Sequence, residues 1–243
     1  MKEKIYTIPV TEAFQADCEC AVCYMLAEIE KRALNSLVGP DNSYMQGDIR
    51  AKTDQKGFCA SHFQMLFKYN NALGLALMVE THLNKINKDF PKVIESVRTF
   101  KRGLLTKGTI KTTKCVEYID KQLASCYICD TVNDVFPRYL DTFIWMWKEQ
   151  EAMRKLLKEG KGFCMRHFAL LMDEAASKLN ERDYSTFCDA AIPAQIKGLK
   201  RLGEDVSWFV QKFDYRFAEE PWKNSKDAIP RAIVKLVSAE VSK

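Results

Sequence analysis

Residues 57–63 read GFCASHF, and residues 162–168 read GFCMRHF. Each phrase follows a CxxC pair, which occupies residues 20–23 in the first case and residues 126–129 in the second. The two CxxC pairs are 106 positions apart, and the two CxxH pairs are 105 positions apart. Chance would rarely reproduce all four positions together with the preceding Gly-Phe and the following Phe, so the sequence predicts an internal duplication.

The duplicated cysteines and histidines have the spacing of metal ligands. Residues three apart on a helical turn share a face, so each CxxC or CxxH presents two ligands to one point. Three thiolates and one imidazole form a closed tetrahedral zinc set, and a helical hairpin within each repeat would bring two pairs together. We therefore predict one site per repeat: Cys20, Cys23, Cys59 and His62 in the first, and Cys126, Cys129, Cys164 and His167 in the second.

The residues around these ligands support metal binding. Gly57 and Gly162 precede the CxxH pairs, where a sharp turn into a helix would need the positive φ that glycine allows. Ligand pairs at helix starts would also gain from the helix dipole, which favours thiolate over thiol. Because a bound metal would clip such turns together, we expect metal binding and folding to be linked.

Three further cysteines lie outside the duplicated set. Cys115 and Cys188 have no counterpart in the other repeat, and we expect them to be buried as small apolar residues. Cys18 forms a CxC with Cys20, but Ala124 stands at the matched position. Cys18 is therefore either incidental or a spare ligand.

His82 is the one histidine outside the motifs. It follows His62 by twenty positions, which on one continuous helix would place it about 200° around the axis. We therefore expect His82 to lie on the opposite face and not to be a ligand.

The composition is that of an ordinary globular protein, with 243 residues, 47% of them hydrophobic and 28% charged. The sequence has no uninterrupted apolar run of about 18 residues, and its start, MKEKIY, lacks the apolar core of a secretory signal. We therefore expect a cytoplasmic protein with no membrane partner. Thiols stay reduced in the cytoplasm, so the nine cysteines are expected to be ligands or apolar residues before disulfides.

A basic segment joins the two repeats. No acidic residue lies between Glu95 and Glu117, whereas six basic residues do: Arg98, Lys101, Arg102, Lys107, Lys111 and Lys114. No recognised nucleic-acid motif accompanies them, so we expect a solvated linker. Binding of nucleic acid or another anion there is the less favoured alternative.

Helical periodicity dominates the chain, and no alternating apolar and polar run predicts a sheet. Apolar residues spaced by three and four from Val132 to Trp147 predict a helix that either begins at Pro137 or is kinked there. The other predicted helices span residues 21–38, 61–88, 91–102, 114–125, 182–190 and 194–213.

These patterns predict an all-α fold of two tandem similar helical repeats, each clipped by a Cys3His metal site. The first repeat with its basic linker spans residues 14–110, and the second spans residues 111–217. Residues 218–243 form a C-terminal tail that we expect to pack on the repeats.

The whole arrangement resembles an uncharacterised family of bacterial cytoplasmic proteins described as a domain of unknown function. The resemblance rests on the duplicated CxxC and GFCxxHF motifs and on two later stretches, FDYRF at residues 213–217 and EPW at residues 220–222 followed by DAIPRAI at residues 227–233. It covers nearly the full chain and implies the same boundaries and metal sites, but it brings no activity.

Three functions are compatible with the motifs. The first is a non-catalytic protein in which two Zn²⁺ ions brace a surface for an unidentified protein partner. The second is a two-cluster iron–sulfur protein that transfers electrons, since cysteine-rich sites with an occasional histidine also hold such clusters. The third makes the two CxxC pairs redox-active dithiols, which leaves both histidines unexplained and lacks the expected βαβ context. A catalytic zinc would need an open position, whereas four protein ligands close the shell.

Overall fold

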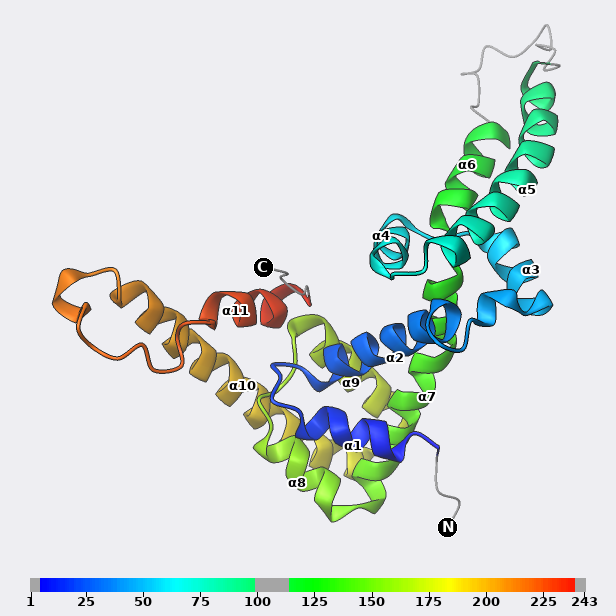
Figure 1. Cartoon of the computed structure of the whole chain (residues 1–243). Coiled ribbons are helices and arrows are strands. Elements are labelled where there is room, and N and C mark those ends of the chain that lie inside the picture. The colour runs from blue at the N-terminus through cyan, green and yellow to red at the C-terminus, as the bar shows by residue number, and fades with distance from the viewer. Residues whose placement is uncertain (1–4, 99–113, 239–243) are drawn as a thin grey trace, which may run out of the picture. The chain divides into compact units, whose positions relative to one another are not determined.

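The computed structural model describes residues 5–98 and 114–238, and all regular structure in these ranges is helical (Figure 1). The predicted all-α fold is confirmed there. Most of the basic linker, the end of the predicted helix 91–102 and the last residues of the tail lie outside the described residues. None of the described helices is both long enough and apolar enough to cross a membrane.

Eleven α-helices and two short 3₁₀ turns make up the described chain. The helices are α1 (Thr7–Gln15), α2 (Ala21–Val38), α3 (Gly47–Lys56), α4 (Ala60–Lys68), α5 (Ala72–Arg98), α6 (Lys114–Ala124), α7 (Tyr127–Glu149), α8 (Glu151–Glu159), α9 (Met165–Lys178), α10 (Glu181–Gln211) and α11 (Ala228–Val237). The 3₁₀ turns are η1 (Ser43–Met45) and η2 (Tyr215–Phe217).

The predicted helix 61–88 is two helices, α4 and α5. The Asn71 side chain accepts a hydrogen bond from the Gly74 N–H at 2.9 Å, so it caps a new helix start at this point. Helix α5 then continues through Pro91, and no separate helix begins there. His62 and His82 therefore lie on different helices, so the expectation that they occupy opposite faces of one helix is wrong.

Two other helices also continue through proline. Pro137 lies inside α7. Pro193 lies inside α10, so the predicted helices 182–190 and 194–213 are one continuous helix. An interior proline costs a helix about 3 kcal/mol. Buried side chains on both sides offset that cost in α10, where Phe187 and Ala191 precede the proline and Leu202 follows it.

The described residues form two compact units. Unit 1 comprises residues 5–28 and 135–238, and unit 2 comprises residues 29–98 and 114–134. Both boundaries fall inside helices, one in α2 and one in α7. The compact units therefore divide the chain differently from the predicted repeats 14–110 and 111–217.

Aromatic residues of both GFC phrases are buried in the unit that holds them. In unit 1, the Phe163 ring lies 6.0 Å from that of Phe14, which stacks on Phe143 at 4.6 Å. In unit 2, Phe58 packs edge to face against Phe63 at 5.3 Å. This second core also contains Leu34, Leu37, Val38, Leu66, Met78 and Ile128. Each core thus anchors the loop that precedes a CxxH pair.

The C-terminal segment of unit 1 folds against the rest of that unit. Helix α11 packs on α9 and α10. The connection from α10 to α11 is held by Lys212, whose Nζ donates to the carbonyls of Phe217 at 2.6 Å and Ala218 at 2.7 Å. Trp208 adds a hydrogen bond from its Nε1 to the Pro221 carbonyl at 3.0 Å.

Candidate metal centres

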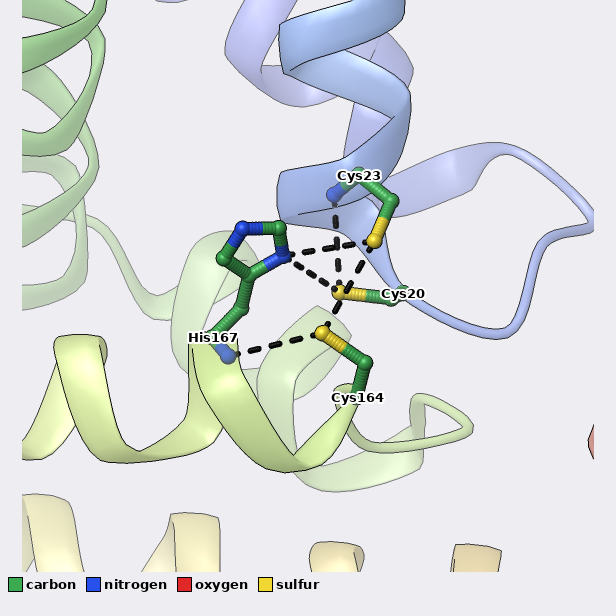
Figure 2. Close-up of side chains that lie close together, drawn as sticks. All are labelled: Cys20, Cys23, Cys164 and His167. Atoms are coloured by element: carbon green, nitrogen blue, oxygen red, sulfur yellow. Dashed lines mark hydrogen bonds between the residues drawn. The ribbon is translucent and has the colours of Figure 1, made fainter. Parts of the chain in front are cut away.

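The eight predicted ligands form two groups of four, one in each unit. Site 1 contains Cys20, Cys23, Cys164 and His167 (Figure 2), and site 2 contains Cys59, His62, Cys126 and Cys129. The predicted pairing within each repeat is therefore wrong. Each group combines the CxxC of one predicted repeat with the CxxH of the other.

The path of the chain explains the exchange. Helix α2 starts directly after Cys20, and its residues 29–38 already belong to unit 2. The chain has therefore entered unit 2 before it reaches the first CxxH pair. There the Tyr127 N–H donates to the Gly57 carbonyl at 3.0 Å, which joins the first GFC loop to the second CxxC. Every CxxC and every CxxH pair has the same internal spacing, so the motifs themselves do not specify which CxxC meets which CxxH.

All four ligand pairs occupy helix starts. Cys59 and Cys164 are the N-caps of α4 and α9, and the histidine of each pair is the third residue of its helix. Backbone N–H groups at these starts donate to the first sulfur of three pairs: Cys23 to Cys20 and Cys129 to Cys126 at 3.5 Å, and His167 to Cys164 at 3.4 Å. Such donors and the helix dipole stabilise thiolates, as the sequence predicted.

The two motif glycines have the positive φ predicted for them, 60° at Gly57 and 77° at Gly162. Each also lies directly against a side chain. A Cβ at Gly57 would stand 2.6 Å from His82 Nε2, and a Cβ at Gly162 would stand 2.7 Å from Gln195 Oε1. Glycine is therefore needed at both positions for its conformation and for its size.

His82 and Gln195 have similar supporting roles. His82 Nδ1 donates to the Asp54 carbonyl at 2.7 Å, and His82 belongs to neither group of four. The buried Gln195 side chain accepts from the Phe163 N–H at 2.7 Å and donates to the Phe163 carbonyl at 2.9 Å. Sequence reasoning missed Gln195, although a glutamine beside Ala194 within an apolar helical stretch was the available signal.

The three other cysteines do not join either group. Cys115 and Cys188 are only partly buried, which differs from the expectation of buried small apolar residues. The Cys18 sulfur lies 3.9 Å from the Ala13 carbonyl. That contact belongs to the turn after α1.

The ligand atoms are spaced for a single ion. In site 1, Cys23 Sγ lies 3.7 Å from Cys164 Sγ, and His167 Nδ1 lies 3.2 Å from Cys23 Sγ and 3.6 Å from Cys20 Sγ. Metal–ligand bonds of about 2.3 Å to sulfur and about 2.1 Å to nitrogen give tetrahedral edges of about 3.8 Å for S···S and about 3.6 Å for S···N. Figure 2 shows the His167 ring directed at the sulfurs.

Site 2 has nearly the same dimensions. Cys59 Sγ lies 3.8 Å from Cys129 Sγ, the tetrahedral value. The His62 Nδ1 atom lies 3.1 Å from Cys59 Sγ, 3.2 Å from Cys126 Sγ and 3.4 Å from Cys129 Sγ. In each site all four ligand atoms lie within 4.8 Å of one another, so each Cys3His group could hold a metal ion.

The ligands of site 2 perturb one another's pKa values. Burial lowers the pKa of His62, but hydrogen bonds to Cys126 and Glu30 outweigh it and raise that pKa to about 10. Burial raises the pKa of the Cys126 thiol, but hydrogen bonds from His62 and from the Cys129 N–H lower it to about 6. Burial is the main cause that raises the pKa of Cys129 to about 12, and the hydrogen bond with Cys126 acts in the same direction. A bound dication would replace these shared protons.

Site 1 shows the same division. Contacts with Cys20 and Cys23 lower the pKa of the Cys164 thiol, whereas the contact with Cys164 raises the pKa of Cys23. Burial lowers the pKa of His167, but hydrogen bonds to Cys164 and Cys20 raise it to about 9. Each site thus has at least one thiol with a lowered pKa, which favours the thiolate form that binds metal.

The surroundings of the two sites differ. His62 Nε2 donates to Glu30 Oε1 at 2.8 Å, the carboxylate–histidine contact that fixes ring orientation at metal centres. Phe136 stands 106 positions after Glu30, where it cannot accept such a bond. In site 1 the Ser238 Oγ lies 2.9 Å from Cys164 Sγ.

A model described as a family of unknown function (DUF6062) matches residues 1–243. No curated protein matches the chain, and no solved structure matches it.

Proposed function

The chain belongs to this family of unknown function, and we propose that it is a cytoplasmic zinc-binding protein whose two sites brace a non-catalytic interaction or scaffold module. One observation carries this proposal. Each site brings three sulfurs and one imidazole nitrogen within 4.8 Å of one another, with sulfur–sulfur distances close to the edges of a zinc tetrahedron.

The spacing favours one ion over an iron–sulfur cluster. In a cluster the protein ligands bind different iron atoms, so they stand farther apart than ligands that share one ion. The sulfur–sulfur distances of 3.7 Å in site 1 and 3.8 Å in site 2 fit the shared ion. A two-cluster electron-transfer protein therefore remains the second candidate.

The histidines favour metal binding over dithiol redox chemistry. His62 Nδ1 and His167 Nδ1 both point at cysteine sulfurs, and a CxxC redox pair has no need of such a ligand. Four protein ligands also close the coordination shell, so a catalytic water has no position at either ion. These features support a structural zinc role.

An apolar groove between α4 and α5 supports the interaction role. It has a volume of about 480 Å³ and is lined mainly by the apolar side chains of Phe63, Phe67, Leu75 and Val79. The Phe67 side chain is 82% exposed. Helix α4 also supplies His62, so a metal in site 2 would fix the helix that forms one wall of the groove. Exposed apolar surface of this kind is typical of protein contacts.

Metal content and colour test the metal assignment. The protein is purified without oxygen and without added metal, and its metals, its acid-labile sulfide and its visible spectrum are measured. We expect close to two zinc ions per chain and no visible absorption. Brown protein that contains iron and sulfide would replace the zinc proposal with electron transfer, and protein without metal would reject both.

Photo-cross-linking in cells tests the interaction role. A photoreactive residue replaces Phe67 in one variant and Lys155 in a control, whose side chain is 70% exposed on α8. We expect a discrete cross-linked protein from position 67 and none from position 155. If the two positions give the same cross-linked products, or position 67 gives none, the groove is not the interaction surface.

A further inference from the structure

A buried lysine of α11 joins the two halves of site 1. Lys235 is 1% exposed, and its Nζ donates to the carbonyls of Glu19 and Lys161, both at 2.7 Å. Glu19 directly precedes Cys20, and Lys161 lies three residues before Cys164. One ammonium group therefore connects the two ligand loops of site 1, residues 16–20 and 160–164.

The position of Lys235 is fixed by charge. Its Nζ lies 3.4 Å from the Glu19 carboxylate, which also accepts two hydrogen bonds from Arg201 at 2.6 and 2.7 Å. Arg231, one turn earlier on α11, contacts the same carboxylate at 3.2 Å. A buried ammonium is costly unless it is paired and hydrogen-bonded, so this arrangement holds α11 in one register against the first loop.

The end of α11 reaches a ligand itself. Ser238 follows the helix in a left-handed conformation, with φ of 61°, and its Oγ lies 2.9 Å from Cys164 Sγ. The Cys164 side chain is fully buried. Contacts from α11 thus reach both ligand loops and one ligand sulfur of site 1.

Site 2 joins its loops by other means. The Tyr127 N–H donates to the Gly57 carbonyl at 3.0 Å, so backbone joins backbone. Lys56, which stands 105 positions before Lys161, pairs with the Asp130 carboxylate instead of with loop carbonyls. All of these residues lie in unit 2, whereas α11 lies in unit 1.

We propose that docking of α11 and metal binding at site 1 are thermodynamically linked through Lys235, and that metal binding at site 2 is not linked to α11. This inference rests on the proposed metal function. Lys235 is a positioning residue, because it holds the loops that carry the ligands and contacts no metal-binding atom. Linkage is reciprocal, so metal at site 1 stabilises the docked helix, and docking of the helix raises metal affinity at site 1.

The test uses full-length chains with one working site. In His62→Ala only site 1 keeps four ligands, and in His167→Ala only site 2 does. Lys235→Met is added to each, and Zn²⁺ affinity is measured by competition with a chromophoric chelator. We expect a loss of about 10- to 100-fold in the His62→Ala chain, the usual effect of removing an outer-shell support, and no change in the His167→Ala chain.

Lys212→Met is the matched control. Lys212 is also buried, at 8% exposure, and its Nζ also donates to backbone carbonyls, those of Phe217, Ala218 and Glu220. We expect it to leave site 1 affinity unchanged in the His62→Ala chain. An equal loss from both lysine variants, or an equal loss at both sites from Lys235→Met, would mean general destabilisation and would overturn the proposal.

A proteolysis measurement on single-site chains that keep Lys235 tests the linkage even if the Lys235→Met variant does not fold. Trypsin can cut α11 after Arg231 and Lys235, and cleavage there reports undocking. We expect removal of metal by a chelator to speed this cleavage several-fold in the His62→Ala chain and to leave it unchanged in the His167→Ala chain. If the His62→Ala chain binds no metal at all, the proposed function fails at site 1. If it binds one ion and α11 cleavage ignores that ion, only the linkage is wrong.

Discussion

Sites 1 and 2 have the same four ligand types at the same kind of helix start, yet their outer contacts differ. In site 2 the histidine is oriented by Glu30, and the ligand loops are joined by backbone. In site 1 a later helix supplies Lys235 and Ser238 around the ligands. The comparison indicates that the same CxxC and CxxH motifs supply the inner ligands of both sites, whereas the contacts around those ligands differ.

Loss of a ligand should have the largest effect, and it should be larger at site 1. Cys164 is fully buried, whereas Cys59 is partly exposed. Structural zinc contributes on the order of 10 kcal/mol in small modules, so Cys164→Ala should remove about one metal per chain and lower Tm by about 10 °C or more. Metal analysis and calorimetry check this result. Cys59→Ala should also remove about one metal but lower Tm less, and full metal retention by either variant contradicts the site assignment.

The motif glycines should give the next largest difference. A Cβ at Gly162 would stand 3.1 Å from the Gln195 Cα and 3.3 Å from the Ala194 carbonyl, which are backbone atoms that cannot move alone. The three atoms nearest to a Cβ at Gly57 all belong to the His82 ring, a side chain that can rotate away. We expect Gly162→Ala to cost about 3 kcal/mol and Gly57→Ala about 1–2 kcal/mol, both including strain from positive φ.

Denaturant unfolding of the zinc-loaded variants measures these free energies. A double variant, Gly57→Ala with His82→Ala, serves as the control, because it removes the ring and should leave only the strain of positive φ. Equal losses from the two single substitutions would mean that the two glycine sites are packed alike.

Removal of the Glu30 carboxylate should have a smaller effect, and only at site 2. Glu30→Gln keeps the size of the side chain but weakens the contact with His62 Nε2. Outer-shell changes of this kind lower metal affinity by about 10- to 100-fold, or about 1.4–2.7 kcal/mol. Chelator competition in the His167→Ala chain, where only site 2 is complete, checks this value. The same substitution in the His62→Ala chain should change nothing.

The pH dependence of the metal-free protein should show the smallest difference between the sites. The folded pKa of His62 is about 10 and that of His167 about 9, both above the ordinary value of 6.5. A raised histidine pKa contributes stability that is fully present below pH 6.5 and lost as pH rises through the folded value. Metal-free site 1 should therefore lose this contribution about one pH unit before site 2.

The Cys126 thiol adds an opposite dependence. Its folded pKa of about 6 lies below the ordinary 9.0, so its contribution is present above pH 9 and lost as pH falls through 6. Ultraviolet titration of thiolate absorbance, in the metal-free parent chain and in metal-free His62→Ala, measures how His62 affects the pKa of Cys126. Loss of His62 should raise the Cys126 pKa, and an unchanged titration would show that the two groups are not in contact.

Several features of the fold could be predicted because their causes are local. Periodic apolar residues predicted α2 and α6 nearly to the residue, and the GFC phrases predicted the positive φ of both glycines. The break between α4 and α5 near Asn71 and the continuation of α10 through Pro193 could not be predicted. The Asn71 side chain caps the start of α5, and packing on both sides of Pro193 holds α10 together.

The sequence by itself determined the all-α fold, the eight candidate ligands and the helix starts that carry them, because these depend on spacing along the chain. The tertiary structure decided which CxxC meets which CxxH, since all the CxxC and CxxH motifs are alike inside and only the path of α2 and α7 decides which of them meet. It also decided the outer contacts. Glu30, Gln195 and Lys235 lie far from their partners in sequence, and only packing brings Glu30 to the His62 ring, Gln195 to the Phe163 backbone and Lys235 to both ligand loops of site 1.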